Sequence, residues 1–224
     1  MPVVDMKGGC ATIETVKTAV QLQINDVSKQ YGTRWVLRNI HADLHGGDAL
    51  LITGHNGAGK STLLRLLAGL QRPSGGTVKY TLNGEVFDPS AARTFLALVG
   101  PDVQLYRELT AIEHLGFINN VRGANQSDAD QRGLLVRVGL GGSEDKLVGS
   151  FSSGMQQRLR YALAILVEPA VLLLDEPNTN LDAAGIALVD HVVAEQRERG
   201  ITVIATNDRR DWQYGTLQLA LDGV

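Results

Sequence analysis

The pattern of apolar and polar positions predicts a mixed α/β chain. Polar and apolar residues alternate from Gln21 to Val27, as in a strand with one buried face, and a second strand is expected from Trp35 to Leu44. Another short strand is expected at 77–82. Continuous apolar runs indicate strands buried on both faces of a parallel sheet, and such runs lie at 50–52, 95–99, 171–174 and 201–206. A mainly parallel sheet flanked by a small N-terminal antiparallel sheet is therefore expected.

Helical spacing of apolar residues appears in the segments between these strands. It is found at 60–70, 110–121, 127–138 and 182–199. The composition changes between Leu105 and Leu166, where glycines interrupt the helical pattern, and this predicts an inserted helical subdomain at about 105–167. Residues 1–20 show no clear period and are interpreted as an N-terminal extension, followed by one domain at 21–224.

Composition narrows the class of protein. The 224 residues carry a formal net charge of −3, which gives no electrostatic reason to expect nucleic-acid binding. The single Cys10 allows no disulfide within the chain and fits a reducing compartment. No apolar run is long enough to cross a bilayer, so we expect a cytoplasmic protein whose link to a membrane, if it has one, comes through a partner.

The segment after the strand at 50–52 fits the phosphate-loop motif G-x-x-x-x-G-K-[ST]. In this motif, glycines let backbone N–H groups surround a polyphosphate while the following helix directs its positive N-terminus at it. Lys60 is expected on the β- and γ-phosphates and Ser61 on Mg²⁺. The predicted nucleotide-binding residues are Gly54, His55, Asn56, Gly57, Ala58, Gly59, Lys60, Ser61 and Thr62.

Two carboxylates follow the apolar run at 171–174. Ligands of open α/β sheets bind at the carboxyl ends of the strands, so Asp175 and Glu176 are expected beside the phosphate loop. Asp175 is assigned to Mg²⁺, through water. Glu176 is assigned to the water that attacks the γ-phosphate, as the residue that orients or deprotonates it.

A third motif points to a family. Phe151-Ser152-Ser153-Gly154-Met155 opens a helix, with Ser152 as its N-cap, and it resembles the Leu-Ser-Gly-Gly-Gln signature of the ATP-binding cassette (ABC) ATPases. Ser152 and Gly154 match the signature, whereas Ser153 replaces a glycine. The resemblance covers nearly all of 21–224. It implies an α/β P-loop NTPase fold with a mainly parallel core sheet, an N-terminal antiparallel β subdomain and an inserted helical subdomain.

The resemblance also implies a mode of action. Tyr31 falls where the family has an aromatic residue that stacks on adenine. Family members form head-to-tail homodimers or heterodimers, in which ATP on one subunit is covered by the partner's signature, here Ser152, Ser153 and Gly154. The chain is thus expected to hydrolyse ATP for transmembrane permease subunits, as an exporter bound peripherally at the inner face of the membrane. The alternatives are a cassette ATPase that acts on nucleic acid or the ribosome, and a binding-only cassette with weak hydrolysis.

Two positions depart from the family pattern. The family's Q-loop glutamine, which reaches Mg²⁺, falls at Pro101 or Asp102 by ungapped counting, and the nearest glutamine is Gln104. Either Gln104 reaches the metal, or Asp102 supplies an oxygen, or the contact is missing; we assign Gln104. The switch histidine is replaced by Asn207, which can donate a hydrogen bond to a γ-phosphate oxygen but cannot become a cation. Asn207 is therefore assigned to catalysis with Glu176.

Overall fold

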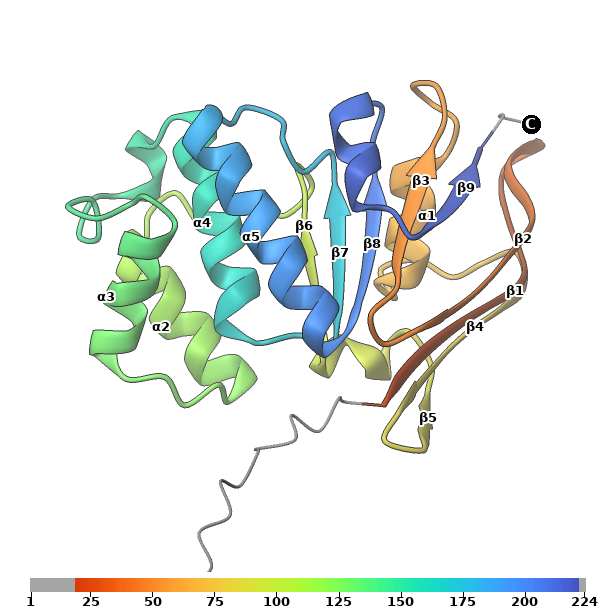
Figure 1. The fold of residues 1–224 in the computed structure, drawn as a ribbon, viewed down its shortest axis with the longest axis horizontal. Helices are drawn as coiled ribbons and strands as arrows, with labels where there is room; N and C mark the ends of the chain where they lie inside the picture. Colours follow the sequence, from red (N-terminus) through yellow and green to blue (C-terminus); the bar gives the residue numbers. More distant parts are fainter. Residues whose placement is uncertain (1–18, 222–224) are drawn as a thin grey trace, which may run out of the picture.

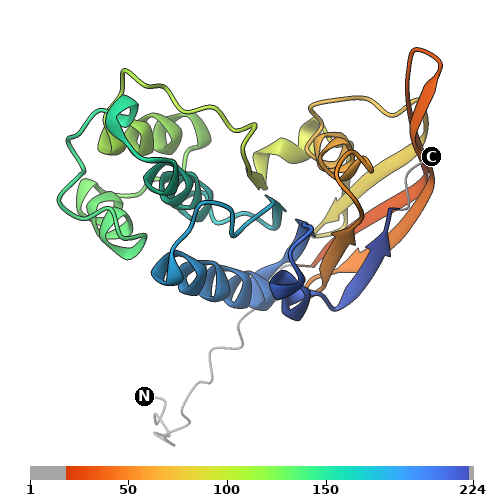
Figure 2. The same cartoon turned by 90° about the horizontal axis from the view of Figure 1, so that it is seen from above.

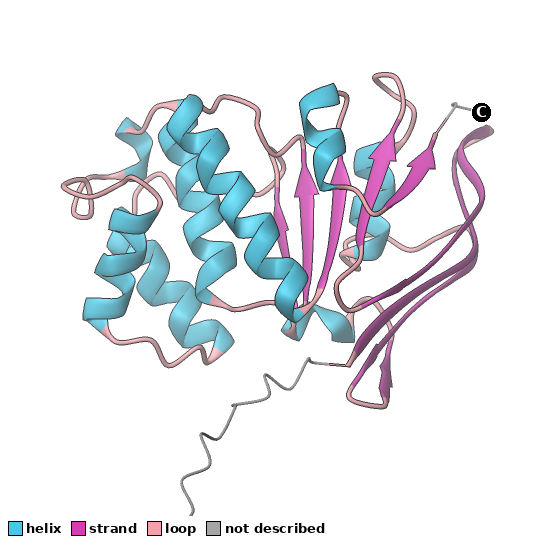
Figure 3. Ribbon diagram, viewed as in Figure 1, coloured by secondary structure: helices cyan, strands magenta, loops and turns pink. Residues whose placement is uncertain are grey.

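The computed structural model describes residues 19–221, which form two sheets and several helices (Figures 1 and 3). The N-terminal extension predicted at 1–20 lies almost entirely outside this range, and β1 begins at Val20. The helices within the described range are too short or too polar to span a membrane.

The N-terminal half contains an antiparallel sheet with strand order β2-β1-β4-β5. Its strands are β1 (Val20–Tyr31), β2 (Arg34–His45), β4 (Gly75–Leu82) and β5 (Glu85–Phe87). Leu22 of β1 lies opposite Leu44 on one side and Tyr80 on the other, and all three side chains are fully buried. The alternation in the sequence thus places one face of this sheet on the core.

The second sheet is parallel and has the strand order β6-β7-β8-β3-β9. Its strands are β3 (Ala49–Thr53), β6 (Leu96–Val99), β7 (Val171–Asp175), β8 (Ile201–Ala205) and β9 (Leu217–Ala220). Because the strands run the same way, the carboxyl ends of β3, β7 and β8 meet at one edge of the sheet (Figure 1). The three segments predicted to carry phosphate-binding and catalytic residues leave the sheet at that edge.

Helices cover both faces of the parallel sheet. They are α1 (Lys60–Leu67), α2 (Ala111–Arg122), α3 (Asp128–Arg137), α4 (Ser153–Leu166) and α5 (Ala183–Arg199), with short 3₁₀ helices η1 (Ala91–Thr94), η2 (Val148–Ser150) and η3 (Arg209–Tyr214). Viewed from above, α1 lies on one face of the sheet and α5 on the other, while α2, α3 and α4 lie beyond the β6 edge (Figure 2). The antiparallel sheet lies on the side opposite those three helices.

Alternate residues of the parallel strands enter two different cores. Leu50 and Ile52 pack with the leucines of α1 and the inner face of the antiparallel sheet. Leu51, between them, belongs to the second core, which also contains Val189 of α5 and Leu159 of α4. This explains why β3 is apolar at every position, since a strand covered on both faces has no side chain directed to solvent.

The fold class predicted from the sequence is confirmed, with small differences at element ends. The helix expected at 60–70 ends at Leu67, and the hairpin strand β5, which follows the Asn83-Gly84 turn, was not predicted. At three residues, β5 is too short to show a period of its own. Side-chain caps start the helices beyond the β6 edge: Thr110 and Ser127 form capping boxes, and Ser152 caps α4.

Candidate functional site

The loop between β3 and α1 depends on glycine for its shape. Gly54, Gly57 and Gly59 have φ angles of 150°, 85° and 101°, which residues with a Cβ rarely adopt. A Cβ on Gly59 would lie 2.9 Å from side-chain atoms of Val36 and Leu37, and a Cβ on Gly54 would lie 2.4 Å from the carbonyl oxygen of Leu221. The glycines that the motif places in this loop are thus needed both for the turn and for its close packing.

Lys60 is held inside this loop. Its side chain is 7% exposed, and Nζ donates hydrogen bonds to the carbonyl oxygens of Gly54, at 2.9 Å, and His55, at 3.4 Å. Nζ also donates to Oδ1 of Asn207, at 2.7 Å, and Nδ2 of Asn207 donates to Oδ1 of Asn56. Asn207, which lies 147 residues after Lys60 in the chain, therefore bridges two residues of the phosphate loop.

A groove of about 600 Å³ opens along the loop. Its lining residues are Tyr31, Arg34, Val36, Asn56, Gly57, Gly59, Lys60, Ser61, Thr62 and Glu176. The Tyr31 ring is 46% exposed, its hydroxyl donates to Oε1 of Gln71 at 2.5 Å, and Lys29 Nζ lies 5.1 Å from the ring centroid. The groove is thus lined both by the Tyr31 ring, which is held by its hydrogen bond to Gln71, and by the phosphate loop. Within the loop, Ala58 is buried, whereas His55 is exposed and its Nδ1 lies 2.8 Å from the carbonyl oxygen of Asn56.

Asp175 ends β7 beside the start of α1. Its side chain is only 5% exposed, and burial raises the pKa of this carboxyl, an effect that the Ser61 hydroxyl beside it opposes. Carboxylate and hydroxyl oxygens are hard ligands of the kind that Mg²⁺ prefers. Asp175 and Ser61 therefore fit the magnesium role predicted for them.

Glu176 has an unusual backbone conformation. Its φ of 49° is rare for a residue other than glycine, and its N–H donates to the carbonyl oxygen of Ala205 at 2.8 Å. The carboxylate directs Oε1 to within 4.0 Å of Lys60 Nζ and Oε2 to within 3.4 Å of the Asn207 N–H. Burial raises the pKa of Glu176, while the Asn207 N–H and the Lys60 cation oppose that rise. A carboxylate with a raised pKa beside a phosphate loop can act as a general base.

The structure separates the two candidates for the Q-loop contact. Gln104 is exposed. It lines neither the nucleotide groove nor the groove beside Ser153 that is described in the next paragraph. Asp102 Oδ2 is bound by Arg65 of α1, with Nε at 2.8 Å, and its negative charge raises the pKa of Asp175. Asp102 is therefore close enough to Asp175 for their charges to interact, but it is already paired with Arg65. The assignment of Gln104 to the metal stays a prediction.

The signature segment lies on the other side of Glu176. Ser152 Oγ accepts a hydrogen bond from the Met155 N–H at 3.2 Å, and Ser152 and Ser153 are both exposed at the N-terminus of α4. Ser153 lines a second groove of about 280 Å³ together with Asp175, Glu176 and Asn180. A Cβ on Gly154 would lie 2.8 Å from the carbonyl oxygen of Asn180, so this position requires a residue without a side chain.

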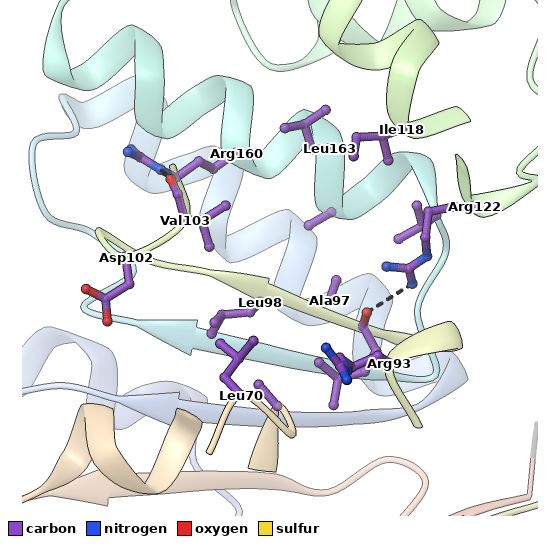
Figure 4. A pocket seen from close by; sticks show the side chains of 14 residues that line it. Leu70, Arg93, Ala97, Leu98, Asp102, Val103, Ile118, Arg122, Arg160 and Leu163 are labelled. Carbon is purple, nitrogen blue, oxygen red and sulfur yellow. Dashed lines mark hydrogen bonds between the residues drawn. The ribbon is translucent and has the colours of Figure 1, made fainter. Parts of the chain in front are cut away.

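An apolar groove of about 380 Å³ lies between the β6 edge of the sheet and the helices α2 and α4 (Figure 4). Its floor is aliphatic, with Leu98, Ile118 and Leu163 among the residues that line it. Arginines lie at both ends: Arg160 is near Asp102 and Val103 at one end, while Arg93 and Arg122 are at the other. Arg122 donates to the carbonyl oxygens of Thr94 and Leu96, at 3.1 Å each, which keeps its guanidinium at the rim.

Several residues at the site were not found from the sequence. Arg34 lines the nucleotide groove, Arg65 binds Asp102, and the buried Asp211 binds Thr206 and Asn178 behind Glu176. None belongs to a short motif with a fixed spacing to the phosphate loop. For Asp211, the available signal was an acidic residue four positions after Asn207 in a loop that follows a buried strand.

Comparisons with known proteins agree with this geometry. A family model described as "ABC transporter" matches residues 37–179. The chain is 34% identical over 187 residues to the cytochrome c biogenesis ATP-binding export protein CcmA of Haemophilus influenzae, covering 84% of this chain and 88% of that protein. It is 35% identical over 165 residues to the Fe(3+) ions import ATP-binding protein FbpC of Escherichia coli O157:H7, covering 72% of this chain but 47% of that protein.

A solved structure described as the ATP-binding subunit of an ABC transporter superposes on this one with a TM-score of 0.79 and 28% sequence identity, covering 90% of this chain and 85% of that one. The resemblance inferred from the phosphate loop, the strand-end carboxylates and the signature is therefore confirmed. The chain belongs to the ABC transporter family, as one of its ATP-binding proteins.

Proposed function

We propose that this protein binds and hydrolyses ATP as the nucleotide-binding subunit of a transporter that exports its substrate. The observation that carries the proposal is that Lys60, Glu176 and Asn207, from three separate segments, meet at the carboxyl edge of the parallel sheet, where Lys60 and Glu176 line the nucleotide groove. Steady-state ATP turnover by the full chain tests it directly, with Lys60→Ala as the blank. Turnover that does not differ between the two proteins contradicts the proposal.

The binding step uses groups that are already in place. The loop N–H groups and Lys60 bind the β- and γ-phosphates, and the Tyr31 ring stacks on the adenine. Asp175 and Ser61 would hold Mg²⁺, with Gln104 proposed as a further ligand, and the ion would neutralise charge on the phosphates. Glu176 accepts a proton from the attacking water, and its Oε1, 4.0 Å from Lys60 Nζ, lies near the position proposed for the γ-phosphate.

The exposed signature implies a second subunit. Ser152 and Ser153 lie at the N-terminus of α4, where unpaired N–H groups and the helix dipole attract phosphate. We propose that these groups and Gly154 close over ATP bound to a second cassette, either a copy of this chain or a related one, in a head-to-tail dimer. ATP binding closes this dimer, and hydrolysis opens it.

The apolar groove in Figure 4 is the proposed docking site for the transmembrane partner. An aliphatic floor between guanidinium groups suits a short segment with apolar side chains and an acidic residue. The groove also includes Asp102 and Val103, which precede Gln104, so a segment seated there lies next to the loop proposed to reach the metal. This partner would hold the protein at the cytoplasmic face of the membrane.

Reversing the charge of Arg93 is expected to weaken this docking by about tenfold, since an acidic partner residue then meets a like charge. The measurement is the amount of a polytopic membrane protein recovered with the tagged full chain from membranes of its own organism. Arg38→Glu is the matched control, because Arg38 is an exposed arginine on β2, away from the groove. Equal recovery with Arg93→Glu and Arg38→Glu contradicts this docking site.

The direction of transport rests on the relatives. The match to an export protein covers 84% of this chain, whereas the match to an import protein covers 72% of it. The longer match to the export protein supports export. Once the partner is known, transport assays in inverted membrane vesicles test the direction, because an exporter accumulates its substrate inside such vesicles only when ATP is added outside.

Asn207 is expected to contribute strongly to turnover. A donor placed at developing phosphate charge is typically worth roughly 3–4 kcal/mol, or two to three decades in rate, so Asn207→Ala is expected to slow hydrolysis by about that factor. Asn207→His is expected to stay active, with a pH dependence near the ordinary histidine pKa of about 6.5 that the wild type lacks at this position. Steady-state turnover across pH distinguishes the three proteins. Wild-type turnover in Asn207→Ala removes Asn207 from the catalytic groups.

A further inference from the structure

A buried carboxyl group lies directly behind the proposed general base. Asp211, in the 3₁₀ helix η3, is 1% exposed. Its Oδ2 accepts a hydrogen bond from Thr206 Oγ1 at 2.5 Å, and its Oδ1 accepts one from Asn178 Nδ2 at 2.5 Å. Thr206 directly follows β8 and precedes Asn207, and Asn178 lies two residues after Glu176. Asp211 therefore joins the two segments that carry the proposed catalytic residues.

The Thr206 hydroxyl has two carboxylates within reach. Oγ1 lies 2.5 Å from Oδ2 of Asp211 and 3.4 Å from Oε2 of Glu176. It also accepts a hydrogen bond from the Asp208 N–H at 2.9 Å. A hydroxyl carries one hydrogen, and the much shorter contact takes it. The Thr206 hydroxyl therefore donates its one hydrogen bond to Asp211, and Glu176 receives none from this side chain.

This choice matters for Glu176 because a hydrogen bond from the Thr206 hydroxyl would occupy a lone pair of Oε2 that can otherwise accept a hydrogen bond from water. The other donor to Oε2 is the Asn207 N–H, at the long distance of 3.4 Å. Because Thr206 donates to Asp211, Oε2 of Glu176 has lone pairs that can accept a hydrogen bond from a water molecule. The direction of one hydroxyl hydrogen thus determines whether Glu176 can bind that water.

Asn178 gives independent evidence that this cluster is arranged around an acceptor at position 211. Its Oδ1 is buried and has no hydrogen-bond partner within residues 19–221, while its amino group is directed at Asp211. A buried acceptor without a partner is destabilising and uncommon in folded proteins. The amide keeps this orientation because the reverse one would place Oδ1 against the Asp211 carboxylate.

We propose that Asp211 is a positioning residue for ATP hydrolysis, which accepts the hydrogen bond of the Thr206 hydroxyl and so leaves the Oε2 lone pairs of Glu176 free to bind the attacking water. This inference rests on the proposed function, because it concerns how readily Glu176 acts as a base. Asp211 itself does not line the nucleotide groove, so it acts through Thr206 and not on the nucleotide.

The first comparison separates turnover from binding. In the full chain, Asp211→Leu removes the acceptor, and the Thr206 hydroxyl then turns to Glu176. Since hydrogen bonds to charged groups are among the stronger ones, kcat is expected to fall by about tenfold or more, while the Kd for ATP changes by less than about twofold. Asp211→Asn keeps an oxygen that accepts from Thr206 and is expected to retain most of kcat.

The second comparison distinguishes this role from a packing role. In Thr206→Val/Asp211→Leu no hydroxyl remains to bind Glu176, so kcat is expected to recover by severalfold over Asp211→Leu, although the double variant has lost more native contacts. Thr206→Val alone is the matched control, and thermal unfolding of each variant reports its fold. If Asp211→Leu does not fold, Asp211→Ala and Thr206→Val/Asp211→Ala replace the pair.

Two results overturn the inference: a double variant no faster than the Asp211 single variant, and an Asp211→Leu protein with the kcat of the wild type. These outcomes are distinct from failure of the proposed function. In that case the wild-type chain itself does not hydrolyse ATP, and no comparison among the variants is needed.

Discussion

Replacing Lys60 with alanine is expected to remove measurable ATP binding. The loop at 54–62 carries no other lysine or arginine, and Lys60 Nζ is held within it at the position where the β- and γ-phosphates are expected. Hydrogen bonds between charged groups contribute roughly 1.5–3 kcal/mol each, so loss of contacts to two phosphates weakens binding by about two to four decades. Calorimetric titration with ATP and Mg²⁺ measures the change.

Lys79→Ala is the matched control, because Lys79 is an exposed lysine on β4 and lines no part of the nucleotide groove. Its ATP affinity is expected to equal that of the wild type. Thermal unfolding of Lys60→Ala without nucleotide shows whether the loss of the hydrogen bonds to Gly54 and Asn207 has changed the fold. An unchanged Kd in a folded Lys60→Ala protein would refute the assignment of the phosphate loop.

Glu176→Gln is expected to lower kcat by about two to four decades, the usual contribution of a general base, while ATP still binds. The amide has the shape of the carboxylate but cannot accept a proton from water. With binding intact and hydrolysis blocked, ATP is expected to hold the closed dimer, which size-exclusion chromatography with ATP and Mg²⁺ detects. Glu168→Gln, at an exposed position before β7, is the control. Hydrolysis at the wild-type rate would exclude Glu176 as the base.

The pH profile gives a second measurement at the same residue. Because burial raises the pKa of Glu176, the acidic limb of the wild-type kcat profile is expected above the ordinary glutamate pKa of about 4.3. Below the raised pKa the carboxyl is protonated and cannot act as a base, so turnover falls as the pH falls. This limb is expected to be absent from the residual activity of Glu176→Gln.

Much of the fold was predictable because it rests on local patterns. The apolar runs at β3, β7 and β8 are buried at every position, as runs without a polar face require in a parallel sheet. The N-cap at Ser152 was also predictable, because a serine before a helix accepts a hydrogen bond from an N–H three residues on. The strand β5 was not, since a three-residue strand exists only through its pairing with β4.

The binding loop and the candidate catalytic carboxylates were likewise visible in the sequence. The chemistry of a phosphate loop depends on residues close together in the chain: Gly54 and Gly59 lie in the loop between β3 and α1, and Lys60 is the first residue of α1. Asp175 and Glu176 could be assigned because they follow a buried strand, whose carboxyl end in a parallel sheet faces the ligand. In each case one short segment contains both the sequence pattern that predicts the site and the side chain proposed to bind or react.

Only the tertiary structure decided which distant residues meet these groups. Asn207 lies 147 residues from Lys60 and contacts it because β8 and β3 are neighbours in the sheet. Arg65 of α1 binds Asp102 in the loop after β6, and Asp211 of η3 accepts a hydrogen bond from Asn178, 33 residues earlier in the chain. The sequence determined the phosphate loop and the strands because hydrophobic periodicity and backbone conformation are local properties. The contacts that these residues make with distant residues depend on the order of strands in the sheet. That order brings together residues whose separation in the chain follows no regular pattern, so it could not be predicted from the sequence.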